Sequence, residues 1–328
     1  MKVDVLPDWA GLDERRWNGL LDRAKFPSVF LSWQWQTEWA RAFTADRALQ
    51  LLTVTDEDGG GLEGLLPLYE EAPGLLRIVG GVDVSDYLDV IVAAGREAEV
   101  WHALLQHRAN QHVEWDLHAI RALSPTVTLV PSLASACGLR VATTREDRCP
   151  VVALPASWDD YLARLSGKDR HELRRKMRKL ERELPGASVR SHHEADGWDA
   201  ALGRFLTLHR LSKVGKARFM DERMERFFRE ATRALAAAGW ARLWFLDWEA
   251  GPVASFLCVE YAGAVGLYNS GFDPTHARLA PGIVLLAHVI RDAIARGIPT
   301  FDFLRGDEPY KLGFGPVLED LFNVRIAS

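Results

Sequence analysis

Residues 263–311 read GAVGLYNSGFDPTHARLAPGIVLLAHVIRDAIARGIPTFDFLRGDEPYK, and this stretch decides the fold. Its apolar residues at 264–270 predict a strand, which a loop follows. Pro281 then opens a helix, in which apolar residues recur at helical spacing until Gly297 ends it. Residues 299–304 predict a second strand. Because a helix N-terminus attracts negative charge, this order of strand, loop, helix and strand is suited to holding an anionic ligand.

Three segments of the stretch carry a family resemblance: LYNSGFDP at 267–274, APGIVLLAHVIRDAIARG at 280–297 and FDFLRGDEPYKLGFG at 301–315. They resemble the GNAT-like acyltransferases grouped with bacterial CelD-type and Fem-type proteins, a group known for two GNAT-like halves in one chain. The closest similarity covers roughly the last third of the chain, and a looser one extends over nearly all of it. The resemblance implies an α/β (α+β) fold, in which two GNAT-like halves have mixed sheets flanked by helices.

The order of the predicted elements is consistent with two halves. In residues 1–150, helices precede a hairpin with a glycine-rich turn at 58–61, and a strand, a helix and a strand follow. Residues 151–328 repeat this order, although the two halves share no visible sequence similarity. We therefore divide the chain into an N-terminal GNAT-like half, 1–150, and a C-terminal GNAT-like half, 151–328, which carries the predicted donor site.

Composition and motifs exclude several other classes of protein. The apolar and charged fractions, 48% and 26%, are those of a soluble globular protein. The three cysteines have no metal-binding spacing and suit a reducing compartment. No apolar run reaches the roughly 20 residues that span a bilayer, and the first residues do not resemble a secretion signal. A zinc motif is excluded because Arg175 stands where HExxH would need its second histidine. These features predict a cytoplasmic protein without a metal.

The strongest charge signal in the chain lies in a helix predicted over 167–184. Its apolar residues form one stripe, and basic residues crowd the remaining surface. A solvated helix face is the more frequent explanation of such a run. Contact with phosphate or nucleic acid is the alternative, since the second half of the chain is slightly basic while the first is acidic. The candidate phosphate-binding residues are Arg174, Arg175 and Arg178.

The resemblance implies that a loop of the form Arg/Gln-x-x-Gly-x-Gly/Ala binds the donor at the start of the helix. Here the loop runs from Arg278 to Ile283, with Pro281 at the first glycine and Ile283 at the last small residue. Proline at the first helical position costs little, but both substitutions limit how closely a pyrophosphate approaches the backbone. Acyl-CoA is the implied donor, and these departures leave aminoacyl-tRNA, which Fem-type relatives use, as an alternative. The candidate donor-binding residues are Asn269, Arg278, Pro281, Gly282 and Ile283.

A dense polar cluster follows the second strand. Phe301 and Phe303 alternate with Asp302, so the rings and the carboxylate must face opposite sides of the sheet. One interpretation is that Asp302 and Arg305 form a local ion pair that fixes a turn. The other is that Asp302 or Asp307 anchors the acceptor amine or acts as its base, while the basic residues hold a negative group. The candidate catalytic residues are Tyr268, Asp302, Arg305, Asp307 and Lys311.

The resemblance implies an enzyme of the GNAT superfamily, a transferase that moves an acyl or acetyl group from acyl-CoA to an amine. The acceptor is implied to be a small-molecule amine, such as an amino sugar, an amino acid, or a cell-envelope or polysaccharide precursor. Two alternatives stay open: a Fem-type aminoacyltransferase that uses tRNA, and a non-catalytic GNAT-like component of polysaccharide biosynthesis. If the cluster is catalytic, Asp302→Asn and Lys311→Met each lower turnover by roughly two to four orders of magnitude and leave the melting temperature nearly unchanged.

Overall fold

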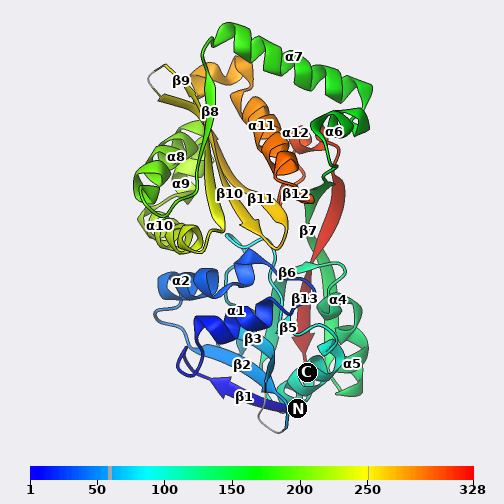
Figure 1. The fold of residues 1–328 in the computed structure, drawn as a ribbon. Helices are drawn as coiled ribbons and strands as arrows, with labels where there is room; N and C mark the ends of the chain where they lie inside the picture. The colour runs from blue at the N-terminus through cyan, green and yellow to red at the C-terminus, as the bar shows by residue number, and fades with distance from the viewer. Residues whose placement is uncertain (58–60, 250) are drawn as a thin grey trace. The chain divides into compact units, whose positions relative to one another are not determined.

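The computed structural model describes residues 1–57, 61–249 and 251–328, and the chain forms two compact units (Figure 1). Unit 1 comprises Met1–Asp147 and Glu319–Ser328, and unit 2 comprises Arg148–Leu318. The last ten residues thus belong with the first unit, whereas the division made from sequence places them in the second half. Most of the glycine-rich turn predicted at 58–61 lies outside the described residues.

Unit 1 contains a mixed sheet and the helices that pack on it. Its strands are antiparallel to their neighbours except β4 and β6, which run parallel. The strand order is β1 (Lys2–Leu6), β2 (Leu49–Thr55), β3 (Leu62–Ala72), β4 (Leu75–Ile78), β6 (Glu114–Arg121) and β13 (Val317–Ala327), with β5 (Ile91–Val92) paired to β3. The helices are α1 (Glu14–Leu21), η1 (Val29–Leu31), α2 (Trp33–Phe43), α3 (Glu97–Ala109), α4 (Pro125–Thr128) and α5 (Val130–Ala136).

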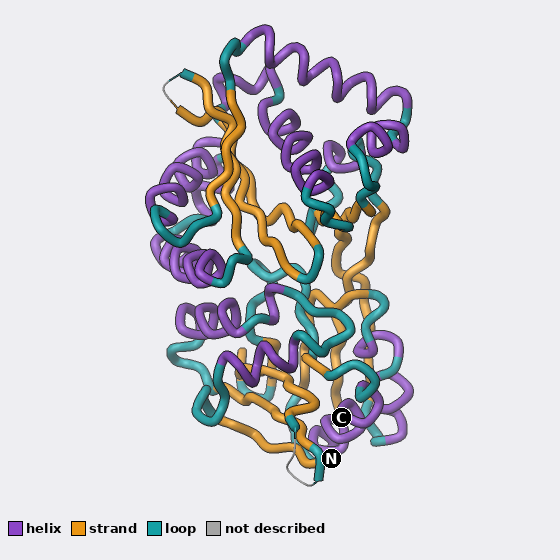
Figure 2. Tube along the Cα trace, in the orientation of Figure 1, coloured by secondary structure: helices purple, strands orange, loops and turns teal. Residues whose placement is uncertain are grey.

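In unit 2, parallel and antiparallel strands are covered by helices on both faces (Figures 1 and 2). The strand order is β7 (Arg140–Ala153), β12 (Thr300–Asp302), β11 (Ala264–Phe272), β10 (Gly251–Tyr261), β9 (Ala241–Trp248) and β8 (Ser188–His192). One face carries α6 (Trp158–Arg164), α7 (Gly167–Glu183) and α11 (Pro281–Ala295). The other carries α8 (Trp198–Ser212), α9 (Val214–Phe219) and α10 (Glu222–Ala237). Two short helical segments, η2 (Pro274–Leu279) and α12 (Pro309–Leu312), connect these elements.

The apolar residues of the stretch 263–311 form much of the core of unit 2. The predicted helix begins at Pro281 as expected, and its apolar face is buried against the sheet. The predicted strands at 264–270 and 299–304 are observed as β11 and the shorter β12. Phe301 and Phe303 are fully buried in the same cluster, with ring centroids 5.1 Å apart. The predicted α/β (α+β) architecture is therefore confirmed.

A charged network links three strands of unit 1. Nε2 of His118, on β6, lies 2.9 Å from Asp116 Oδ2, and its Nδ1 lies 2.9 Å from Glu146 Oε1. Asn323, on β13, donates a 2.7 Å hydrogen bond to the other oxygen of Asp116. Burial lowers the pKa of His118, but the hydrogen bonds and charges of both carboxylates outweigh it and raise the pKa to about 9. The imidazolium is therefore the native form near neutral pH.

This network predicts a loss of stability in alkaline solution. A histidine whose pKa rises on folding stabilises the fold fully below its unfolded pKa of roughly 6.5, and loses that contribution as the pH rises through about 9. The shift corresponds to about 3 kcal/mol. In urea titrations of unit 1 unfolding, His118→Gln should therefore be much less stable than wild type in mildly acidic buffer and nearly equal to it above the folded pKa. An equal difference at both pH values would contradict this linkage.

Candidate active site

The site is built where two parallel strands part. Strands β11 and β12 pair over only three positions, from Ala264 with Thr300 to Gly266 with Asp302. Strand β12 ends there, whereas β11 continues to Phe272 along β10. Over residues 267–272, the edge of β11 that faces away from β10 has no partner strand among the described residues. The divergence of the two strands leaves backbone groups that can pair with an extended ligand.

A β-bulge interrupts the pairing of β11 with β10. Leu257 pairs with Asn269 and Cys258 pairs with Leu267, so Tyr268 is the extra residue on β11. Tyr268 and Asn269 both contact the helices of one face: the Tyr268 ring stacks on Phe228 of α10, with centroids 5.6 Å apart. Asn269 Oδ1 lies 3.0 Å from His209 Nε2 of α8. The bulge thus ties two of the predicted site residues to the helical layer.

Two basic side chains that sequence reasoning missed lie beside the bulge. His209 is 1% exposed, and burial together with the charge of Lys216 lowers its pKa to about 4, so the imidazole is neutral. Lys216, on α9, donates hydrogen bonds to the carbonyl oxygen and the hydroxyl of Ser270. Burial and the charge of Lys213 lower the pKa of Lys216 to about 8. An ammonium group whose pKa is lowered towards neutrality therefore lies against the open part of β11.

The start of α11 is the second part of the site. Ala280 has the left-handed angles φ 50° and ψ 52°, and its carbonyl accepts from the N–H groups of Ile283 and Val284 at 3.0 and 3.2 Å. Pro281 has no N–H, whereas the N–H of Gly282 has no acceptor among the described residues. A Cβ built on Gly282 would meet no atom within 4 Å. The helix start is therefore open to a ligand at Gly282.

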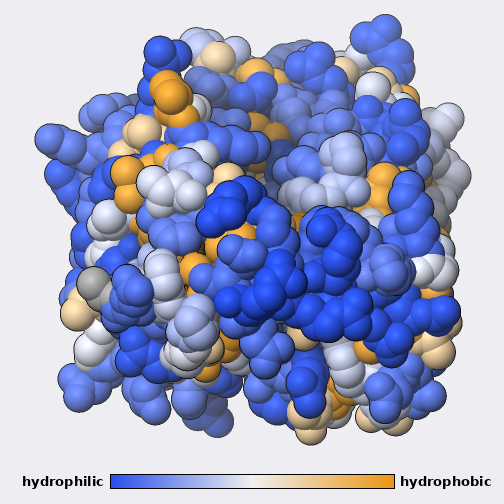
Figure 3. Space-filling model, turned by 90° about the horizontal axis from the view of Figure 1, so that it is seen from above, coloured by the Kyte–Doolittle hydropathy of each residue, from blue (hydrophilic) through white to orange (hydrophobic). Residues whose placement is uncertain are grey.

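The basic helix α7 lies next to this helix start. Lys179 donates a 3.0 Å hydrogen bond to the carbonyl of Arg278, and the Arg278 guanidinium lies 3.9 Å from Glu183. Arg175 is bonded to Glu172 through two hydrogen bonds of 2.7 and 2.8 Å. Arg174 and Arg178 are exposed and have no ionic partner in the described part of the chain. Strongly hydrophilic side chains gather on the face of the molecule that carries α7 (Figure 3).

A known protein family matches the greater part of unit 2. The sequence of residues 167–312 matches the model of a family described as "Acetyltransferase (GNAT) domain". Residues 167–312 form a GNAT domain. They include α7, the bulge, the start of α11 and the cluster after β12. A search of curated proteins found no match to the sequence of the chain.

Solved structures share the fold of the whole chain. The crystal structure of FemX has a TM-score of 0.67 at 11% identity, covering 98% of this chain and 97% of that one. The C-terminal domain of a putative lysylphosphatidylglycerol synthetase from Agrobacterium fabrum has a TM-score of 0.58 at 11% identity, covering 94% and 92%. L-PGS from Bacillus licheniformis has a TM-score of 0.56 at 12% identity, covering 95% and 91%. At these identities the likeness establishes the fold alone.

The cluster after β12 shapes a turn of the GNAT domain. Asp302 is 6% exposed, and its Oδ1 accepts a 2.7 Å hydrogen bond from the N–H of Leu304, whose φ is 55°. Lys311 is 3% exposed and donates to the carbonyls of Arg305 and Gly306 at 2.9 and 2.8 Å. Its ammonium also lies 2.8 Å from Glu308. Through these contacts Asp302 and Lys311 hold the backbone of the turn.

The remaining predicted residues of this cluster lie nearer the surface. Asp307 is exposed, and its carboxylate lies 3.7 Å from the guanidinium of Arg148. Arg305 is half-buried, and its carbonyl is one of the acceptors of Lys311. Within the cluster, Lys311 thus contacts the backbone of Arg305, and the chemical role of these residues stays a prediction.

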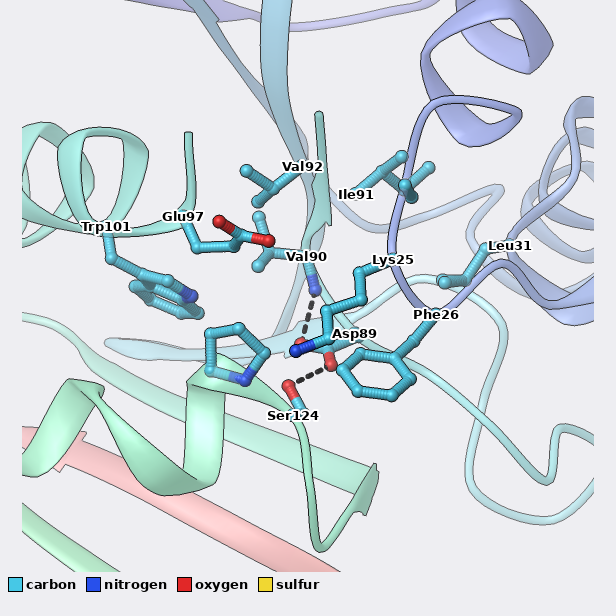
Figure 4. Close-up of a pocket in the computed structure, with 12 residues that line it drawn as sticks. Lys25, Phe26, Leu31, Asp89, Val90, Ile91, Val92, Glu97, Trp101 and Ser124 are labelled. Carbon is cyan, nitrogen blue, oxygen red and sulfur yellow. Dashed lines mark hydrogen bonds between the residues drawn. The ribbon is translucent and has the colours of Figure 1, made fainter. Parts of the chain in front are cut away.

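A hollow of about 360 Å³, open space included, lies in unit 1 (Figure 4). Asp89 contributes a buried carboxylate that accepts from the hydroxyls of Ser124 and Thr126 and from the N–H of Val90. Burial raises the pKa of Asp89 to about 6, against those hydrogen bonds. Because this carboxylate is already bonded by three donors, the hollow offers mainly apolar walls, and we place the candidate active site in the GNAT domain.

Among the described residues, no helix is long and apolar enough to cross a membrane.

Proposed function

We propose that the GNAT domain is an N-acyltransferase that takes an acyl group from acyl-CoA and gives it to an amine. The observation that carries the proposal is the open start of α11 at Gly282 beside the unpaired edge of β11. A helix start favours negative charge, which suits the pyrophosphate of the donor. The strand edge supplies N–H and C=O groups for the amides of an extended donor chain.

The departures from the usual donor loop change how an anion would be held. Pro281 has no N–H, and the N–H groups of Ile283 and Val284 bond to Ala280, so Gly282 supplies the one unoccupied N–H of the first three. The rest of the attraction would come from side chains, because Arg278 is 72% exposed and α7 lies beside it. We therefore propose Arg278 and Arg178 as the cations that meet the phosphates.

In the proposed reaction the amine nitrogen attacks the thioester carbonyl, the N–C bond forms, the C–S bond breaks, and the amine loses a proton. The site must align the two groups and accept that proton. Lys216 is the proposed base, since a pKa of about 8 lies close to the operating range of such a group. The neutral His209 would hold Asn269, and thereby the bulge, in place. The proposed acceptor is an amine of an amino sugar, an amino acid, or a cell-envelope or polysaccharide precursor.

Gly282→Val tests donor binding directly. A Cβ there meets no atom within 4 Å, and the branched side chain beyond it adds bulk at the residue whose N–H has no acceptor among the described residues. We expect the melting temperature without ligand to stay near that of wild type. The affinity for acetyl-CoA, measured by calorimetry or by thermal shift, should fall about tenfold or more, a loss of at least about 1.4 kcal/mol.

Gly19→Val, in α1 of unit 1, is the matched control because its added side chain also meets no atom within 4 Å. It should bind acetyl-CoA like wild type. If Gly282→Val folds normally and keeps full affinity, the helix start is not the donor site.

An aminoacyl-tRNA is the second candidate donor, and one observation favours it. Arg174 and Arg178 project from the exposed surface of α7 without ionic partners among the described residues, on the helix that contacts η2. Unpaired arginines of this kind suit a polyanion, whose binding would weaken steeply with salt. Stabilisation by tRNA but not by acetyl-CoA would favour this donor, and the reverse would favour acyl-CoA.

A further inference from the structure

Exposed apolar side chains gather on two short segments of unit 2, 211–219 and 310–318, and the first of these is also strongly basic. Leu211, Val214 and Phe219 are 57%, 72% and 37% exposed, and they lie within nine residues at the end of α8 and along α9. Helix α9 has no buried residue at all, although it carries two of these three side chains. A helix of a globular protein normally turns its apolar residues towards a core. This segment turns them to the outside.

The same segment is basic. Residues 211–220 read LSKVGKARFM and contain three cations, Lys213, Lys216 and Arg218, and no acidic residue. Asp221 follows the segment directly, and Glu308 lies near enough to raise the pKa of Lys216 against the larger effect of burial. Exposed apolar side chains interleaved with cations are typical of surfaces that meet anionic lipid headgroups and the hydrocarbon just below them.

The segment also adjoins the candidate active site. Lys216 is bonded to Ser270 on the open part of β11. At the next residue, Gly271, α8 approaches β11 so closely that a Cβ would lie 2.5 Å from the backbone nitrogen of His209. A molecule that rests on residues 211–219 is therefore next to the strand edge at which we propose that the acyl group is transferred.

We propose that residues 211–220 dock on an anionic lipid surface and that the acceptor amine is presented from that surface, as part of an amphiphile with an anionic headgroup. Val214 and Phe219 would enter the edge of the hydrocarbon, and Lys213 and Arg218 would meet headgroup phosphates. The identity of the acceptor rests on the proposed function, whereas the docking surface does not. Helix α7 serves as a comparison surface. It is more basic than residues 211–220 but carries none of the exposed large apolar residues found in the described chain.

Sedimentation of the full chain with vesicles tests the proposal. The probes are vesicles of phosphatidylcholine alone and vesicles that also contain phosphatidylserine. Wild type should sediment with the anionic vesicles only, and less so as salt is added. The double variant Leu211→Asp/Val214→Asp, which changes the two most exposed apolar side chains of the segment, should lose this binding. Lys213→Gln should weaken it about fivefold, the effect of one cation near an anionic surface.

Two controls separate this surface from other exposed features. Leu123→Asp removes a side chain in unit 1 that is 74% exposed, and it should bind vesicles like wild type. Arg174→Gln removes an exposed cation of α7 and should have little effect. The proposal is overturned if the double aspartate variant binds like wild type, or if Arg174→Gln weakens binding as much as Lys213→Gln.

The melting temperature, measured with and without acetyl-CoA, distinguishes loss of vesicle binding from damage to the donor site. The double aspartate variant changes only exposed side chains, so it should melt like wild type and keep its stabilisation by acetyl-CoA. Loss of that stabilisation together with vesicle binding would mean that the segment is structural, which overturns the docking proposal. If acetyl-CoA does not stabilise even the wild type, the proposed donor fails while the vesicle result stands.

Discussion

Gly271→Ala is expected to destabilise the GNAT domain by roughly 3 kcal/mol, at the upper end of the usual cost of overpacking. A Cβ at this position would lie 2.5 Å from the backbone nitrogen of His209, 2.6 Å from the carbonyl carbon of Leu208 and 2.8 Å from the Cα of His209. All three are backbone atoms of α8, so no side-chain rotation can relieve the contact. The helix and the strand must move apart.

The movement of α8 away from β11 would also disturb the candidate active site. Helix α8 carries His209, whose ring bonds to Asn269 at the bulge of β11. Separation of α8 from β11 would lengthen this hydrogen bond and loosen the bulge. In calorimetry, a loss of this size should lower the melting transition of unit 2 by about 10 °C, given a change of roughly 2–4 °C per kcal/mol for a unit of this size.

Gly282→Ala is the matched control, because a Cβ there would meet nothing within 4 Å and the position is helical. It should melt at or slightly above the temperature of wild type, since alanine is the better helix former. An equal melting temperature for Gly271→Ala and wild type would show that α8 does not contact β11 closely at Gly271.

The parts of the fold that sequence predicted are those with strong local periodicity. Helix α11 begins at Pro281 because proline suits the first helical turn, and its apolar spacing leaves one side for the core. The C-terminal strand is different. Glu319–Ser328 joins unit 1, where β13 pairs with β6. Strand pairing across about two hundred residues depends on the whole topology, and nothing in the local sequence specifies it.

In the candidate site, too, the sequence predicted the residues of local segments and missed side chains that come from distant elements. The predicted residues do lie along β11, η2, the start of α11 and the turn after β12, because short segments carry the family resemblance. His209 and Lys216 were missed because they come from α8 and α9, some sixty and fifty-four residues from their partners on β11. A histidine on the buried face of an amphipathic helix was the available signal, since Phe205 one turn earlier is also buried.

Lys311→Met is the second substitution with a large expected effect. The structure predicts that it lowers the stability of unit 2, whereas the sequence predicted a loss of turnover. From the sequence, loss of a cation that holds a substrate would lower turnover and leave the melting temperature unchanged. The ammonium is instead 97% buried and has three partners within its own turn: two carbonyls and the carboxylate of Glu308. Methionine has a similar length but donates no hydrogen bond.

The expected loss of stability is about 3 kcal/mol, or about 10 °C in the melting transition of unit 2. Buried acceptors that lose their donor cost about 1–3 kcal/mol each, whereas Glu308 is exposed enough to turn towards water. Asp307→Asn, in the same turn, is the control: its carboxylate is 57% exposed and lies 3.7 Å from Arg148, so it should change stability by less than about 0.5 kcal/mol. The outcome that would restore the catalytic role of Lys311 is a variant that melts with wild type yet no longer transfers the acyl group, because a turn held by three bonds to one ammonium cannot lose that ammonium without weakening.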